Sequence, residues 1–255
     1  MSNIHPSQQP PSYDATASTS QAVNANAGDD GVPDDFKYGV SVGQSDRSIR
    51  HAFVRKVYVI LALQLLATTG VGGFIRHLDG SGFLLQHIWT VYGAMFGSIA
   101  ALFGVIWKRN SHPANFILLS LFTVLEAYTL GAVTAFYPTA MVLQALAITL
   151  GLFVVLTLFT LQSRYDFSQL GSILFFALCS LVLVGFVQLF VPFSRTFDLV
   201  VAVAMAVVFC GYILYDTHMI MNRMSPDEYI FASVSLYLDV VNLFLAILRI
   251  LSDQD

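Results

Sequence analysis

The segment Thr139–Leu161, TAMVLQALAITLGLFVVLTLFTL, decides the class of fold. It contains no charged side chain, and its length suits the ~20 apolar residues that a helix needs to cross the hydrocarbon core of a bilayer. A helix is the expected conformation, because a backbone in lipid must satisfy its own hydrogen bonds. The segment therefore predicts a membrane-spanning helix.

Six further apolar blocks of similar length lie on either side of this segment. Stretches with charged residues or proline separate them, such as 108–113 and 222–228. The chain is 56% hydrophobic and only 11% charged, which is about half the charged fraction of an ordinary soluble domain. We therefore predict an all-α polytopic membrane protein with seven spans: Val54–Ile75, Phe83–Trp107, Ala114–Phe136, Thr139–Leu161, Leu170–Val191, Phe197–Met221 and Tyr229–Leu251.

The first 44 residues have a different composition. They are rich in Pro, Ser, Asn and Asp, and cannot bury enough apolar surface to offset chain entropy. We therefore expect a disordered tail over 1–44 and a transmembrane domain over 45–255. Pro10, Pro11 and Tyr13 form a Pro-Pro-x-Tyr motif, the type of sequence that WW domains bind as a polyproline helix. A WW-domain ubiquitin ligase is thus a candidate partner, and a chance tyrosine in a Pro-rich tail is the alternative.

The distribution of basic residues predicts the orientation. If the N-terminus and every second loop share one side, that side carries nine of the 12 Lys and Arg residues, and the other side carries Arg76, Arg195 and Arg249. The excess of positive charge places the N-terminus in the cytoplasm. Seven crossings would put the C-terminus on the opposite side of the membrane. If the last segment were re-entrant, the C-terminus would lie on the same side as the N-terminus. The chain has no basic face, so nucleic acid is not an expected partner.

Three acidic residues fall inside the predicted spans and away from their ends, namely Glu126, Asp216 and Asp239. A charge near the bilayer centre costs at least roughly 2.5–3.5 kcal/mol, and no Lys or Arg lies deep in a span to compensate. Asp216 and Asp239 enter from the same side on consecutive spans. At ~1.5 Å per residue they can lie within about two helical turns of each other in depth.

If their faces meet, Asp216 and Asp239 form a carboxylate pair. Such a pair shares a proton at low pH and exposes two negative groups at higher pH, because two adjacent carboxylates resist ionising together. Carboxylate oxygens are good calcium ligands, so the pair is a candidate metal site and pH sensor. Arg109, at the cytoplasmic end of the second span, could pair with one carboxylate. Glu126 is either an interhelical hydrogen-bonding group or an acid that lines a pore.

Several motifs around these residues resemble one known family. They are GYILYDT (211–217), SPDEY (225–229), SLYLDVVNLFLAILRIL (235–251), FVRKVY (53–58) and EAYTLG (126–131). Together they resemble the transmembrane Bax-inhibitor-motif family, and most of all its lifeguard-type branch, from about residue 45 onward. The composition of the tail suggests a fungal member.

The resemblance implies a bundle with the last helix in the centre, and a pH-sensitive calcium leak across an internal membrane such as the endoplasmic reticulum, Golgi or vacuole. It gives the role of pH-sensing pair to Asp216 and Asp239. It gives the role of latch to Arg109, with Lys108 one position away. It also implies links to suppression of cell death and to the endoplasmic-reticulum stress response, and hence cell-death regulators as partners. Calcium is the transported ion, and no cofactor is expected.

The same residues are compatible with functions other than a channel. A calcium/proton exchanger would use the same acids, and a non-transporting interaction protein would regulate cell death through its partners alone. An intramembrane aspartyl protease also needs two membrane aspartates, but it has a Gly-x-Gly-Asp element where this chain has Tyr237-Leu238-Asp239. We therefore do not expect an enzyme.

Overall fold

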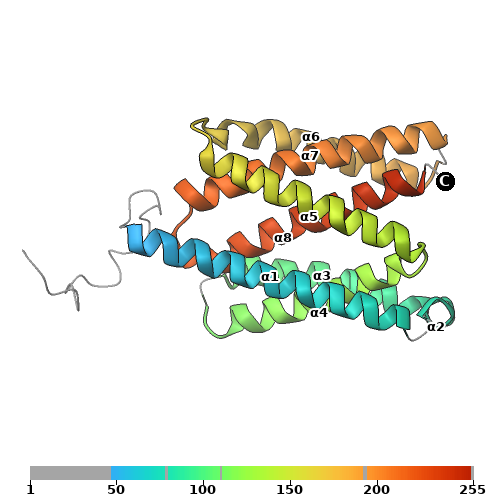
Figure 1. The fold of residues 1–255 in the computed structure, drawn as a ribbon. Helices are drawn as coiled ribbons and strands as arrows, with labels where there is room; N and C mark the ends of the chain where they lie inside the picture. Colours follow the sequence, from blue (N-terminus) through green and yellow to red (C-terminus); the bar gives the residue numbers. More distant parts are fainter. Residues whose placement is uncertain (1–46, 78–79, 110, 192–193, 254–255) are drawn as a thin grey trace, which may run out of the picture.

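The computed structural model describes residues 47–77, 80–109, 111–191 and 194–253. Its α-helices are α1 (Arg47–His77), α2 (Gly80–Gln86), α3 (Ile88–Trp107), α4 (Ala114–Thr134), α5 (Thr139–Gln162), α6 (Leu170–Gln188), α7 (Arg195–Asn222) and α8 (Tyr229–Ser252), with 3₁₀ turns η3 (Phe167–Gln169) and η4 (Pro226–Glu228) (Figure 1). In this part of the chain, seven helices are long and apolar enough to cross a membrane, which confirms the predicted fold class. The predicted disordered tail and its Pro-Pro-x-Tyr motif lie outside the described residues.

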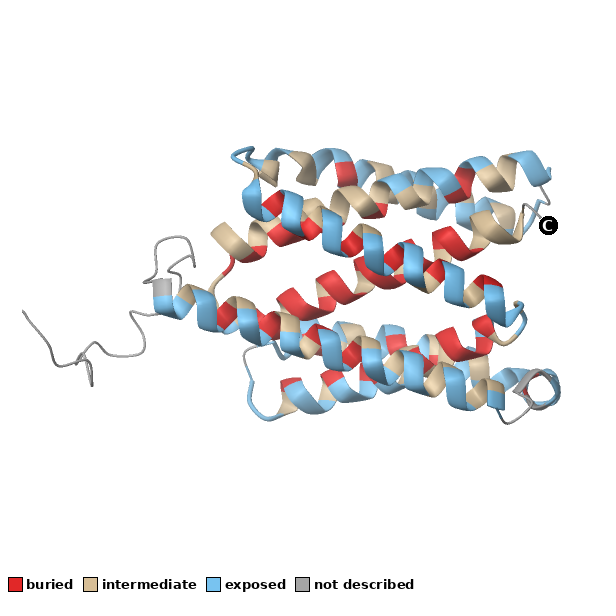
Figure 2. Cartoon of the chain, in the orientation of Figure 1, coloured by how far each residue is buried: buried red, intermediate tan, exposed pale blue. Residues whose placement is uncertain are grey.

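The last helix, α8, runs through the middle of the bundle (Figure 1). In its membrane-spanning window 72% of the residues are buried, against 6% to 39% in the other spans. One group of helices, α1, α3 and α4, lies on one side of α8, and α5, α6 and α7 lie on the other. Figure 2 shows the buried positions concentrated along α8. The predicted central position of the last helix is confirmed.

Two of the predicted span boundaries need correction. Helix α1 begins at Arg47, ahead of the predicted start at Val54. The predicted second span from Phe83 was wrong, because the chain leaves helical geometry at His87 (φ −123°, ψ 41°) and α3 begins only at Ile88. The polar residues Gln86 and His87 favour the interface over the bilayer core, so α2 forms a separate short helix.

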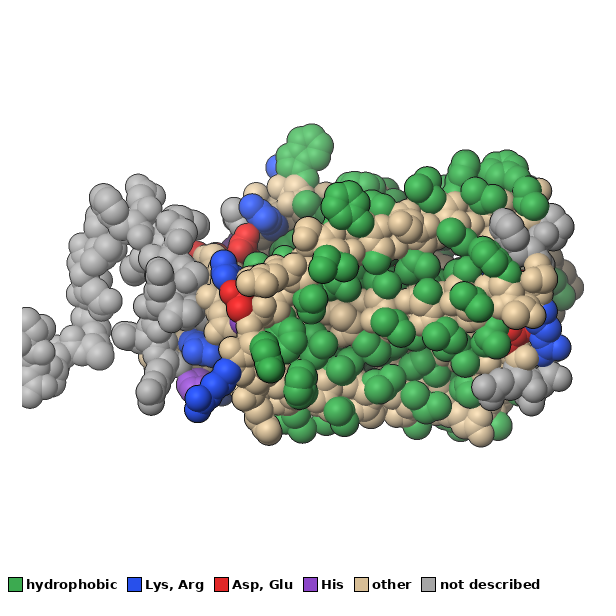
Figure 3. All heavy atoms as spheres, turned by 90° about the horizontal axis from the view of Figure 1, so that it is seen from above, with side chains coloured by type: hydrophobic (Ala, Val, Ile, Leu, Met, Phe, Trp, Pro, Cys, Tyr) green, Lys and Arg blue, Asp and Glu red, His purple; other side chains and the backbone are tan. Residues whose placement is uncertain are grey.

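The last segment crosses the bundle completely and does not re-enter. Helix α8 has 24 residues, which corresponds to about 36 Å. Beyond its end, the Asp253 carboxylate accepts a 2.8 Å hydrogen bond from Nε of Arg195, the first residue of α7. The visible face of the molecule carries an apolar belt between charged groups at its two ends, as expected for a bilayer-spanning protein (Figure 3).

Candidate functional site

A tight hairpin connects α7 to α8. Ser225 and Glu228 form a capping box in which the Ser225 N–H donates to Glu228 Oε2 at 3.2 Å, and Pro226 begins the 3₁₀ turn η4. These interactions satisfy backbone donors that the start of a helix leaves unpaired. The two helices therefore run antiparallel from the same end, which places Asp216 of α7 and Asp239 of α8 at similar depth.

The structure brings these two acids together. The carboxyl groups of Asp216 and Asp239 lie within hydrogen-bonding reach of each other between α7 and α8. Both side chains are buried, with 8% of Asp216 and 5% of Asp239 exposed. Oδ2 of Asp239 has no hydrogen-bond partner among the described residues. Two buried carboxyl groups in this contact need a shared proton, because two full negative charges would repel strongly in a poorly hydrated interior.

Few other groups complete the site. Tyr212, one turn before Asp216 on α7, lies near both carboxyl groups. In the described ranges, no Lys, Arg or His forms an ion pair with either aspartate, and no group of three or more His, Cys, Asp or Glu residues is placed to hold a metal. Calcium takes about six to eight oxygen ligands, so water or backbone oxygens would have to supply most of them. The pair is therefore better suited to bind a cation transiently than to hold one tightly.

Arg109 lies at the same end of the bundle but does not bond to the pair. Its Nη1 is 3.2 Å from Oε1 of Glu228, at the start of α8. This ion pair connects the end of α3 to the α7–α8 hairpin, and Lys108 only caps α3 through its backbone. The predicted direct contact between Arg109 and an aspartate is therefore not present in this structure. The sequence reasoning did not single out Glu228.

Glu126 lies on the other side of the central helix. Its half-buried carboxyl group on α4 is close to Ser98 of α3 and to Tyr237 of α8. Tyr237 and Asp239 are two positions apart, which turns their side chains roughly 200° away from each other around α8. The structure does not bring Glu126 together with Asp216 and Asp239, so the three acids do not form one cluster.

A polar clasp that the sequence reasoning missed closes the end of α7. The Asp166 carboxylate lies 3.0 Å from Nε2 of His218 and 3.1 Å from Nη2 of Arg223. Hydrogen bonds from Ser168, together with Arg223 and His218, lower the pKa of Asp166 from 3.8 to about 2. This clasp fixes the connection between α5 and α6 to the α7 end nearest Asp216. No sequence spacing could reveal it, because its members come from segments far apart in the chain.

The fold and this site define a polytopic helical membrane protein with a buried aspartate pair beside its central helix. The family model described as "Inhibitor of apoptosis-promoting Bax1" matches residues 50–255, and the chain belongs to this Bax inhibitor family. The matched range includes Arg109, Glu126, Asp216 and Asp239.

Relatives from distant organisms are similar over most of their length. "Bax inhibitor 1" of Schizosaccharomyces pombe is 44% identical, over 96% of this chain and 90% of the relative. "Golgi anti-apoptotic protein" of vaccinia virus (strain Lister) is 44% identical, over 86% of this chain and 93% of the viral protein. "Protein lifeguard 4" of Mus musculus is 42% identical, over 86% of this chain and 92% of the mouse protein.

Proposed function

We propose that the protein is a pH-sensitive calcium leak channel of an endomembrane, gated by the Asp216–Asp239 pair. The single observation that carries the proposal is the contact between two buried carboxyl groups that have no basic partner among the described residues. A buried ionisable residue in a membrane helix is costly and calls for a functional reason. In this protein two such residues lie on consecutive helices and contact each other.

The sign of the pH response follows from this contact. With one proton shared, a hydrogen bond holds α7 against α8 and the path is closed. When the proton leaves, two negative groups repel each other, the helices separate and oxygens become available to a passing calcium ion. The Arg109–Glu228 ion pair acts as the latch at the mouth, holding α3 to the start of α8 rather than bonding an aspartate directly.

Calcium efflux from proteoliposomes tests the proposal. We expect efflux to rise with pH in the wild type, and to lose this pH dependence in Asp216→Asn and Asp239→Asn, because an amide cannot release the proton. Asp198→Asn is the matched control: it is the same chemical change on α7, at an acid that pairs with Arg249 instead. Flux that is indifferent to pH, or that keeps its pH dependence in both pair variants, would contradict the proposal.

The same assay separates the alternatives. A calcium/proton exchanger would need a proton gradient, whereas a channel would conduct without one. A non-transporting interaction protein would show no flux above empty vesicles. If Glu126 lines the pore, Glu126→Gln lowers the amplitude of the flux and leaves its pH dependence in place.

A role in restraining cell death accords with the names of the viral and yeast relatives. A calcium leak from an internal store would limit the calcium available for a death signal, and cell-death regulators would then be partners. Endomembrane residence, with the N-terminus in the cytoplasm, accords with the distribution of basic residues and with the Golgi name of the viral relative. A link to the endoplasmic-reticulum stress response belongs to the same proposal.

The tail motif supports a separate partner. Pro10, Pro11 and Tyr13 would bind a WW-domain ubiquitin ligase, which would mark the protein for sorting. Tyr13→Ala is expected to abolish WW-domain binding and reduce ubiquitination while calcium flux is unchanged. WW-domain binding that persists in Tyr13→Ala would show that the motif is not the binding site.

A further inference from the structure

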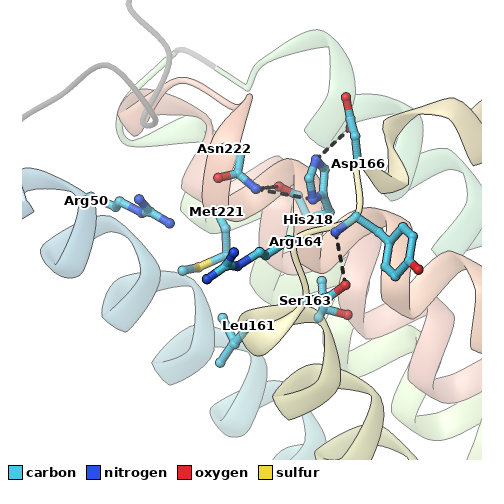
Figure 4. A pocket seen from close by; sticks show the side chains of 10 residues that line it. Arg50, Leu161, Ser163, Arg164, Asp166, His218, Met221 and Asn222 are labelled. Atoms are coloured by element: carbon cyan, nitrogen blue, oxygen red, sulfur yellow. Dashed lines mark hydrogen bonds and ion pairs between the residues drawn. The ribbon is translucent and has the colours of Figure 1, made fainter.

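A cavity of about 260 Å³ opens at the end of the bundle where α1 begins and where α5 and α7 end (Figure 4). Its wall includes Arg50 of α1, Leu161 of α5, His218 and Asn222 of α7, and Arg164 of the α5–η3 connection. A water molecule occupies about 30 Å³ of liquid, so the cavity has room for several waters or for a small anion. Three helices that enter the membrane separately meet here.

Two arginines without an acid partner face this cavity. The side chains of Arg50 and Arg164 point into it from opposite walls (Figure 4). Within the described part of the chain, neither guanidinium forms an ion pair. The acid in the wall, Asp166, is already bonded to His218 and Arg223. Two like charges that face each other repel, and an anion between them would turn this repulsion into attraction.

The donors suit a phosphate group. A guanidinium presents parallel N–H groups that match two oxygens of a phosphate. The Ser163 hydroxyl accepts a hydrogen bond from the Tyr165 N–H at 3.1 Å and has its own proton to donate. A calcium ion would be repelled by the same arginines, so this cavity is not a cation site.

The position of the cavity favours a lipid over a soluble phosphate. It lies where the apolar helix α1 begins and where α5 and α7 end, which is the level expected for lipid headgroups. Leu161 lines the cavity and is 46% exposed, and Leu158, one turn deeper on α5, is 50% exposed. An acyl chain could therefore follow the apolar surface of α5 while the headgroup enters the cavity. Basic pockets between membrane helices on the cytoplasmic side commonly bind lipid phosphates.

We propose that this cavity binds the phosphate headgroup of an anionic membrane lipid, held between Arg50 and Arg164. The bound lipid connects α1 to the end of α7 that carries His218 and Asn222. Since Asp216 lies on α7 within two turns of Asn222, the lipid stabilises the helix that forms half of the aspartate pair. The proposal does not depend on calcium permeation, and binding is measured without flux.

Native mass spectrometry of the full-length protein in detergent tests the site. The probes are short-chain phosphatidic acid, phosphatidylcholine with the same chains, and inorganic phosphate. We expect phosphatidic acid to bind in preference to phosphatidylcholine, and to bind roughly tenfold more weakly for each arginine lost, in Arg50→Gln and Arg164→Gln. Arg55→Gln is the matched control, because Arg55 is exposed on α1 and does not line the cavity.

Three outcomes would overturn the proposal. Unchanged affinity in the double variant Arg50→Gln/Arg164→Gln would show that the lipid binds elsewhere. An equal loss in Arg55→Gln would mean diffuse attraction to surface charge. Competition by inorganic phosphate at the same concentration as the lipid would assign the cavity to a soluble anion. Arg50→Lys/Arg164→Lys keeps both charges and is expected to retain most of the binding, which guards against a loss caused by misfolding.

Discussion

The two faces of α8 bury different chemistry. Toward α7 the helix presents Asp239 against Asp216, and Oδ2 of Asp239 has no hydrogen-bond partner among the described residues. Toward α1 it presents Tyr237, whose hydroxyl lies 2.8 Å from Oγ1 of Thr68. The hydroxyl pair needs no added proton, whereas the carboxyl pair depends on one. In the proposed mechanism, one face is therefore a fixed seam and the other is the contact that pH switches.

The fixed side also contains a close approach between the backbones of α1 and α4. A methyl group added at Gly131 of α4 would lie 3.1 Å from the Cα of Gly72 and 2.6 Å from Cδ1 of Ile75 on α1. Small residues let membrane helices approach this closely, and close packing is what holds helices together in lipid. In the proposed mechanism, this group of helices is the base against which α7 moves.

The largest expected effect is on the fixed face. Tyr237 is fully buried, and its ring packs edge-on against Phe122 with centroids 5.8 Å apart. Tyr237→Ala is expected to lower the free energy of unfolding by about 3–5 kcal/mol through the cavity it leaves, as measured by denaturation in detergent. Tyr237→Phe removes only the bond to Thr68 and costs about 1 kcal/mol. If Tyr237→Phe abolished the pH response of calcium flux, the distinction between the two faces would fail.

A smaller effect is expected at the contact between α1 and α4. Gly131→Ala should lower the free energy of unfolding by about 1–3 kcal/mol, because its methyl group pushes the two helices apart. Gly70→Ala on α1 is the matched control, since nothing lies within 4 Å of its added methyl group. It should be neutral, or stabilising by up to about 1 kcal/mol through helix propensity. Equal destabilisation by both changes would show that this close approach is unimportant.

The smallest effect concerns the clasp at the end of α7. The pKa of Asp166 is lowered to about 2 from 3.8, so its carboxylate stabilises the folded state above pH 3.8, and this contribution disappears as the pH falls toward 2. Asp166→Asn should therefore lower the unfolding temperature slightly at neutral pH and have no effect once the pH is well below 2. Thermal unfolding of both proteins across this range checks the sign, and a difference that grew on acidification would contradict it.

The sequence predicted the features that depend on hydropathy and on the position of a residue along its helix. Seven apolar blocks gave the spans, and counting residues from the helix ends placed Asp216 and Asp239 at similar depth. Hydropathy could not show that α8 is central, because the spans are similarly apolar, with mean hydropathy between 1.6 and 2.6. That expectation came from the family resemblance.

The parts that could not be predicted depend on loops and on the rotation of helices. Arg109 pairs with Glu228, and Asp166 with Arg223, across long sequence separations that no local spacing encodes. Glu126 belongs to α4, and the side of α8 that it faces depends on how α4 is rotated about its own axis, which the sequence does not specify. The break at His87 is a departure of one residue's φ and ψ angles from helical values.

Infrared spectroscopy of protein with isotope-labelled aspartate, recorded as the pH is raised, would detect the shared proton between Asp216 and Asp239 itself. We expect a protonated aspartate carboxyl band in the wild type that disappears with rising pH. The band should be altered in Asp216→Asn and Asp239→Asn and unchanged in Asp198→Asn. A spectrum without this band at any pH, or a band that both pair variants leave untouched, would contradict the claim that one proton holds α7 against α8.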